Sequence, residues 1–191
     1  MQGTKAIALE LDRRVLDPPL LPADPLQREP VEEAERWGDE VLQPAARRII
    51  WSALKRDRAP IRSYLEGSRV GVPLSVAAAS TAPIAVLAAR FNEATDANVV
   101  ADLRALPATI DHVDSLISDG VIGGEEPNVA DFQIATSLAL LLTMDDVRPL
   151  FAGRPAERLA NRLVPAFPGH TPPVLPPAWL EPIAASTRPS G

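Results

Sequence analysis

Three observations in the sequence predict an all-α protein. Alanine and leucine, which favour helices, are abundant, and aromatic residues make up only 4% of the 191 residues. Apolar residues recur every three or four positions over long stretches, whereas the period-two alternation of β-strands is hard to find. Hydrophobic residues make up 46% of the chain and charged residues 23%, so it can bury a core and does not have the composition of a disordered protein.

The first part of the chain combines a short helical pattern with a proline-rich connector. Residues 4–14 have the apolar spacing of a helix. The following D-P-P-L-L-P-A-D-P (17–25) cannot be helical, because proline disfavours helix for itself and for the residue before it. We predict an N-terminal helical unit over 1–16, a linker over 17–28, a helical domain over 29–166 and a proline-rich tail over 167–191.

A long helix is predicted from about residue 30 to residue 57. Its acidic start and basic end complement the helix dipole, and Pro44 is expected to kink it. A second long helix is predicted over residues 96–118, where apolar residues spaced 4-3-4-3-4 indicate one buried face. Further helices are predicted over 60–66, 73–92, 129–143 and 154–164.

Two further predictions concern the last part of the chain. Asp145 and Asp146 precede a short helix at Val147, and we interpret them as its caps rather than as a cation site. The proline-rich stretch 164–180 is predicted to be extended. It is expected to pack on the bundle through Phe167, Val174 and Trp179, and the alternative is a polyproline ligand for a partner domain.

The segment E-E-P-N-V-A-D-F (125–132) has the signature of a helix start. Asn128 is a strong N-cap, and the side chain of Asp131 can accept a hydrogen bond from the Asn128 amide, as in a capping box. Pro127 and Phe132 occupy the two positions of a hydrophobic staple. The following helix is apolar nearly all round, which predicts a place in the middle of the bundle. We therefore interpret Asp131 as a folding residue rather than a catalytic carboxylate.

This segment resembles the glutathione S-transferase family. In that family an Asn or Ser/Thr, followed three residues later by Asp, opens the buried core helix of the all-α C-terminal domain. The wider phrase G-G-E-E-P-N-V-A-D-F-Q-I-A-T (123–136) is similar to bacterial members. The resemblance implies a glutathione S-transferase C-terminal-domain-like helical bundle. It also implies that residues 1–16 are the last helix left from a thioredoxin-like domain.

The stretch 3–25 is similar to that last helix and to the linker between the family's two domains. In the family, a Ser at the start of this helix binds the γ-glutamyl end of glutathione with its neighbouring amide. Thr4 matches the Ser position and is the candidate glutathione-binding residue, although Gly3 stands where the family has an acidic residue. The residue that stabilises the glutathione thiolate and the cis-proline cannot be placed in this chain. We therefore predict no catalytic residue, and a chain that is catalytically incomplete as given.

The resemblance also implies a pocket for a hydrophobic co-substrate along the first long helix. Trp37, Val41, Arg48 and Trp51 follow one stripe of that helix at three- and four-residue steps, and they are the pocket candidates. The alternative is that both tryptophans are simply core residues, because large side chains at helical spacing mostly pack. No metal site is predicted, because the two histidines, His112 and His170, lack metal-ligand spacing.

Composition excludes several partners. The net charge of −6 argues against nucleic acid, because phosphate binding needs a basic face. The absence of cysteine excludes disulfides and a cysteine nucleophile. Acidic residues interrupt the apolar N-terminus before it reaches signal-peptide length. The uncharged stretch 70–89 holds prolines and small polar residues, which favour a buried helix over a membrane span. We expect a cytoplasmic protein with no membrane partner.

Two functions stay open at this level. The first is a glutathione S-transferase-like protein, in which a full-length form would conjugate glutathione, its co-substrate, to a hydrophobic electrophile and would use no other cofactor. The second is a non-catalytic helical module that binds a ligand, a second copy as a homodimer or another protein. The second hypothesis rests on the first helix, which would expose an apolar face where the sheet of a thioredoxin-like domain would cover it.

Overall fold

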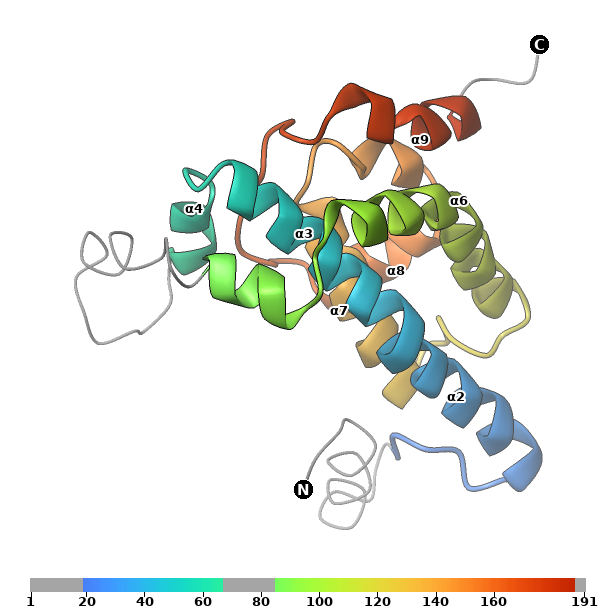
Figure 1. The fold of residues 1–191 in the computed structure, drawn as a ribbon. Helices are drawn as coiled ribbons and strands as arrows, with labels where there is room; N and C mark the ends of the chain where they lie inside the picture. Colours follow the sequence, from blue (N-terminus) through green and yellow to red (C-terminus); the bar gives the residue numbers. More distant parts are fainter. Residues whose placement is uncertain (1–18, 67–84, 188–191) are drawn as a thin grey trace.

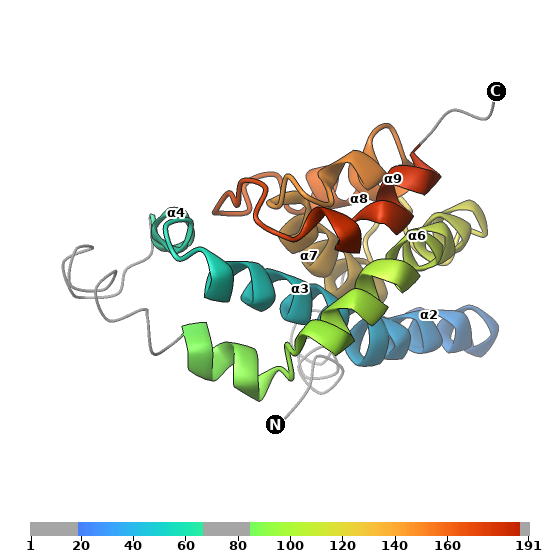
Figure 2. The same cartoon turned by 45° about the horizontal axis from the view of Figure 1, so that its top comes forward.

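The computed structural model describes residues 19–66 and 85–187, which form a bundle of helices (Figures 1 and 2). The α-helices are α2 (Pro25–Trp37), α3 (Gln43–Arg56), α4 (Ile61–Leu65), α6 (Asp96–Ser118), α7 (Val129–Leu142), α8 (Pro155–Leu163) and α9 (Glu181–Ser186). Shorter turns are the π-helical η1 (Gly38–Leu42) and the 3₁₀ turns η2 (Arg148–Phe151) and η3 (Pro177–Trp179), and residues 85–91 are also helical. The described part of the chain contains no β-strand, so the all-α prediction is confirmed there.

Several predictions fall outside the described residues. They include the N-terminal helix over 4–14, the candidate glutathione residue Thr4 and the first part of the helix predicted over 73–92. Among the described helices, none has both the length and the apolarity that crossing a membrane requires.

Helix α7 lies in the middle of the bundle, as its composition predicts. It packs against α2, α3 and α8. Side chains on nearly every side of it are buried, including Ile134, Leu138 and Leu141, which are fully shielded from solvent. A helix that is apolar all round can be covered in this way only if neighbours surround it.

Helix α6 has the predicted bounds, and the residues of the 4-3-4-3-4 pattern form its buried face. Val99, Leu103, Leu106, Ile110 and Val113 are all buried. The helix packs against α3, α8 and α9. Thr95 is its N-cap and accepts a hydrogen bond from the amide of Asn98 at 3.2 Å.

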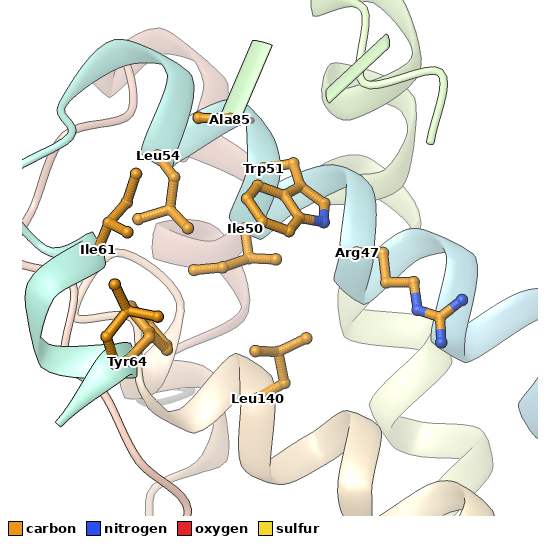
Figure 3. A pocket seen from close by; sticks show the side chains of 9 residues that line it. Arg47, Ile50, Trp51, Leu54, Ile61, Tyr64, Ala85 and Leu140 are labelled. Carbon is orange, nitrogen blue, oxygen red and sulfur yellow. The ribbon is translucent and has the colours of Figure 1, made fainter. Parts of the chain in front are cut away.

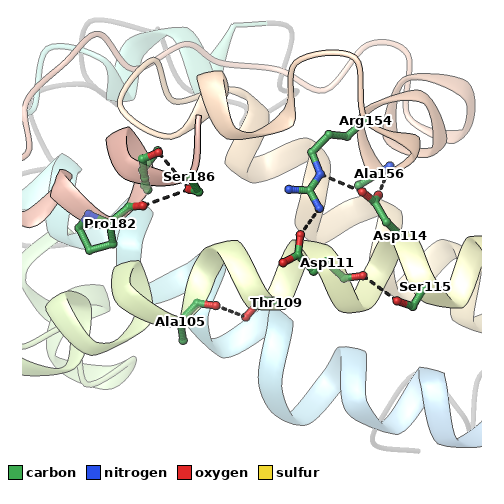
Figure 4. A network of polar contacts seen from close by, with 10 residues as sticks. Ala105, Thr109, Asp111, Asp114, Ser115, Arg154, Ala156, Pro182 and Ser186 are labelled. Carbon is green, nitrogen blue, oxygen red and sulfur yellow. Dashed lines mark hydrogen bonds and ion pairs between the residues drawn. The ribbon is translucent and has the colours of Figure 1, made fainter. Parts of the chain in front are cut away.

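The polar edge of α6 also organises the start of α8 (Figure 4). Asp114 accepts hydrogen bonds from Arg154 Nε at 2.8 Å and from the amide of Ala156 at 2.9 Å, so a residue of α6 caps α8. Arg154 also donates to Asp111. Partial burial lowers the pKa of the Arg154 guanidinium, but its bonds to the two carboxylates outweigh that effect and leave the pKa raised.

The long first helix begins five residues earlier than predicted and contains a π-helical turn. Asp24 caps it by accepting from the amide of Leu26 at 3.1 Å, and Pro25 is tolerated in the first turn because no helical amide bond is needed there. The π turn η1 lies just before Pro44, where a kink is predicted, and in it the amide of Gln43 donates to the carbonyl of Gly38.

The tail packs on the bundle and is anchored by the acidic pair after α7. Phe167, Val174 and Trp179 are partly buried against the core, and α9 adds a short helix that the sequence analysis did not predict. The interpretation of Asp145 and Asp146 as helix caps is wrong, because no side chain caps η2. Their carboxylates accept from the tail instead. Asp146 bonds to the amides of Val174 and Leu175 at 2.9 and 3.0 Å, and Asp145 bonds to the His170 ring at 2.9 Å.

Candidate ligand-binding site

A cavity of about 370 Å³ lies between α3, α4 and α7 (Figure 3). Its walls are almost entirely apolar. The lining residues are Arg47, Ile50, Trp51, Leu54, Ile61, Tyr64, Leu65, Ala85 and Leu140. Its size is that of a small-molecule site, because ligand pockets are hollows of roughly 300–1,000 Å³ lined mainly by apolar and aromatic side chains.

Helical spacing gathers the lining residues from elements that are distant in sequence. Ile50, Trp51 and Leu54 lie on one face of α3, three and four residues apart. Ile61, Tyr64 and Leu65 come from α4, and Leu140 faces them from α7. The short α4 therefore closes a wall that α3 and α7 alone would leave open.

Tyr64 presents its ring to the cavity while its hydroxyl is bonded elsewhere. The hydroxyl lies 2.7 Å from Thr143 Oγ1 and 2.7 Å from Thr171 Oγ1. A part-buried tyrosine hydroxyl is usually paired, and here its partners come from the end of α7 and from the tail. The hydroxyl is thus already hydrogen-bonded to protein groups, and the ring forms part of the apolar wall.

Among the lining residues that the structure describes, Arg47 is the one with a charge. It is exposed, lies at the edge of the cavity beside Trp51, and has no hydrogen bond or ion pair with the residues that the structure describes. An unpaired guanidinium at the edge of an apolar hollow can attract an anionic group on a ligand whose body is apolar.

The four predicted pocket residues do not lie together. Trp51 lines the cavity, but the ring of Trp37 packs edge-on against His112 of α6, with centroids 4.5 Å apart, beside a second cavity. Val41 is 46% exposed. Arg48 donates to both carboxylate oxygens of Asp102 of α6, at 2.6 and 2.8 Å, and these bonds raise the pKa of the Arg48 guanidinium despite its partial burial.

The π turn explains why the stripe is divided. A stripe at three- and four-residue steps assumes 3.6 residues per turn throughout the helix. The wider turn at Gly38–Leu42 has the effect of one extra residue, which rotates everything after it by about 100° relative to what precedes it. Trp37 and Trp51 lie on opposite sides of this turn, so they face different neighbours.

The start of α7 has the capping box at the predicted residues. Asn128 Oδ1 accepts from the amides of Ala130 and Asp131, and Asp131 Oδ2 accepts from the amide of Asn128 at 2.9 Å. Asp131 is completely buried and also accepts from the amide of Gly123 at 2.7 Å. Its carboxylate is thus occupied by backbone groups. The staple between Pro127 and Phe132 stays a prediction, and Phe132 is 44% exposed.

Ser63, His170 and Asp145 meet near the cavity, but they do not form a nucleophilic relay. The His170 ring bonds to Asp145, whereas Ser63 Oγ accepts from the backbone amide of His170 at 2.9 Å and donates to the carbonyl of Pro60 at 2.7 Å. A serine nucleophile needs the ring nitrogen of its base within reach. These contacts fasten the tail to α4.

Of the lining residues, Trp51 is the one among the four residues predicted from the sequence. Ile50 and Leu54 carry the helical spacing of a buried face, so they could have been assigned to the core but not to a cavity. No local pattern indicates that Tyr64 and Leu140 face each other across the cavity, because they are 76 positions apart in the sequence (140 − 64). Within the described residues, no group of three or more His, Asp or Glu side chains is arranged to hold a metal ion.

Comparisons with known proteins give no family for this chain. No protein-family model matches it, and neither a curated protein nor a solved structure is detectably similar. The class that fold and site define is an all-helical bundle with an apolar cavity, and the resemblance to glutathione S-transferases stays a prediction.

Proposed function

We propose that this chain binds a hydrophobic small molecule in the cavity between α3, α4 and α7. The observation that carries the proposal is a hollow of about 370 Å³ with almost wholly apolar walls and aromatic rings from Trp51 and Tyr64. Burying apolar ligand surface against such walls contributes about 25 cal/mol per Å² before the costs of association.

The glutathione S-transferase resemblance gives this binding a chemical setting. In a full-length relative, the thiolate of glutathione would attack an electrophile held by the helical domain. This chain would supply the electrophile pocket and, through Thr4, part of the glutathione site. We expect the 191-residue polypeptide by itself to conjugate glutathione to chlorodinitrobenzene no faster than the uncatalysed reaction. Conjugation well above that background would contradict the incomplete-enzyme proposal and leave the binding proposal standing.

Filling the cavity should weaken binding. Leu140→Trp places a larger side chain in the lining, and we expect binding of the fluorescent probe N-phenyl-1-naphthylamine to weaken roughly tenfold or more, because a packed pocket tolerates little added volume. Fluorescence titration measures the affinity, and thermal unfolding verifies that the variant is folded. The control is Leu26→Trp, the same substitution at a side chain that is 83% exposed on α2. Equal affinities for the two variants would place the probe elsewhere.

Arg47 should favour ligands with an anionic group. The probe 8-anilinonaphthalene-1-sulfonate shares the ring system of N-phenyl-1-naphthylamine and adds a negative charge. We expect Arg47→Met to weaken binding of the sulfonate about threefold at low salt and to leave the neutral probe unchanged, since an exposed charge contributes only modestly. The difference should shrink as salt screens it. An equal effect on both probes would indicate that Arg47 acts by packing rather than by charge.

A further inference from the structure

The tail segment 169–171 contacts Tyr64, one of the side chains of the cavity wall. Thr171 is 1% exposed, and its Oγ1 bonds to the Tyr64 hydroxyl. The backbone of Thr171 also pairs with the end of α7. Its amide donates to the carbonyl of Thr143 at 2.8 Å, and its carbonyl accepts from the amide of Asp145 at 3.0 Å. The segment is therefore fixed to α7 on one side and to Tyr64 on the other.

Two further contacts bring the segment against α4. Ser63 Oγ bonds to the backbone of His170, which joins α4 to the tail a second time. Gly169 lies directly on the Tyr64 ring, so closely that a Cβ atom at this position would be 2.1 Å from Tyr64 Cδ1. The ring is thus confined between Gly169 and the cavity, and any movement of the segment changes the space into which the ring can move.

We propose that the segment 169–171 controls the apolar cavity by positioning Tyr64, so that docking of this segment and binding of a ligand favour each other. The coupling to ligand binding rests on the proposed function, whereas the positioning of Tyr64 does not. When the segment is docked, the hydroxyl of Tyr64 is held between Thr143 and Thr171 and the ring completes the wall. When the segment leaves, the ring loses its backing and one of its two hydroxyl partners. A ligand that packs on the ring therefore favours the docked segment. By thermodynamic linkage, the docked segment strengthens binding of the ligand by the same factor.

The test uses Thr171→Val, which removes the hydroxyl and keeps the shape of the side chain. Thr171→Ser retains the hydroxyl and should behave like the wild type. Thr109→Val is the matched control, because the Thr109 hydroxyl bonds within α6 to the carbonyl of Ala105 and lies outside the cavity lining. All three variants are made in the full 191-residue chain.

The first measurement needs no ligand. Tyr64 is the only tyrosine of the chain, so ring-labelled tyrosine gives NMR signals from this side chain alone. We expect Thr171→Val to move these signals and to speed exchange of the amides of His170, residue 171, Val174 and Leu175 about three- to tenfold, as the loss of one hydrogen bond implies. Thr171→Ser and Thr109→Val should leave both unchanged. Tyr64 signals that stay in place in Thr171→Val would overturn the proposal.

The second measurement adds N-phenyl-1-naphthylamine. We expect Thr171→Val to bind the probe about three- to tenfold more weakly, and saturating probe to slow exchange of these same four amides in the wild type. Unchanged affinity and unchanged exchange would overturn the coupling even if the probe binds. A wild type that binds no probe would instead contradict the proposed function, and the tyrosine signals would still decide whether the segment positions Tyr64.

Discussion

Replacing Asp131 by alanine should destabilise the protein by about 3–5 kcal/mol. The carboxylate is fully buried, and it accepts hydrogen bonds from the amides of Gly123 at 2.7 Å and Asn128 at 2.9 Å. Each such bond to a charged group contributes about 1.5–3 kcal/mol, and the variant leaves both part-buried amides without their acceptor. Urea unfolding followed by circular dichroism measures the loss, which corresponds to a fall in melting temperature on the order of 10 °C.

A second helix start provides the control for this prediction. Thr95 caps α6 in the same way, but its bond to the amide of Asn98 is exposed to solvent. Thr95→Ala should therefore cost only about 1 kcal/mol. Asp131→Asn should fall between the two, because one oxygen remains as an acceptor. If Asp131→Ala costs no more than Thr95→Ala, burial does not strengthen the capping box, and our interpretation of Asp131 as a folding residue loses its main support.

The difference between these two caps also indicates which parts of the fold can be predicted from sequence. The start of α7 is encoded locally, because Asn128 and Asp131 stand three residues apart before an apolar run. Its strength is not local, since the first helical amide, that of Val129, donates to the carbonyl of Leu20, and Gly123 adds a bond to Asp131. The sequence thus predicts the position of the cap, whereas the contribution of the cap to the free energy of unfolding depends on the tertiary structure.

The face of a long helix is predictable only while its hydrogen bonding stays regular. In α6 the apolar pattern identifies the buried residues, because all 23 residues follow one α-helical register. Between Trp37 and Trp51 the π turn breaks the register, and the two tryptophans line different cavities. Gly38 lies within that turn and packs closely on α7, where a Cβ would approach Gln133 Cγ to 3.0 Å. The π turn η1, between α2 and α3, therefore lies where this long helix packs against α7.

The cavity is less predictable than the helices because it depends on contacts between distant segments. Helical patterns at α3 and α4 indicate buried faces, but a buried face does not reveal whether its neighbour fills the space against it. The acidic pair after α7 illustrates the same limit. Asp146 precedes a turn, as a helix cap would, yet its partners are tail amides 28 and 29 residues away. The sequence shows which nearby amides a carboxylate could bind. It does not show that a distant tail segment will take their place.

Gly169→Ala should have the second large effect, and the effect should be confined to the tail. Gly169 has a φ of +100°, a conformation that costs a residue with a Cβ about 1–2 kcal/mol. The added methyl would also lie 2.1 Å from Tyr64 Cδ1 and 2.2 Å from Cε1, so the ring or the tail must move. Overpacking of this kind adds about 1–3 kcal/mol. We expect a total loss of about 3–4 kcal/mol, measured by urea unfolding and by exchange of the amides of His170, Thr171, Val174 and Leu175.

Gly153→Ala separates the two causes of that loss. Gly153 has a φ of +75°, but a Cβ there would meet nothing within 4 Å, so this variant carries the backbone strain without the clash and should cost about 1 kcal/mol. The excess for Gly169→Ala then measures the contact with Tyr64. That excess cannot exceed the free energy of detaching the tail, because beyond it the segment leaves the bundle and the strain is relieved. Equal losses for the two variants would mean that the Tyr64 ring yields freely to the methyl group, and that Gly169 does not confine it.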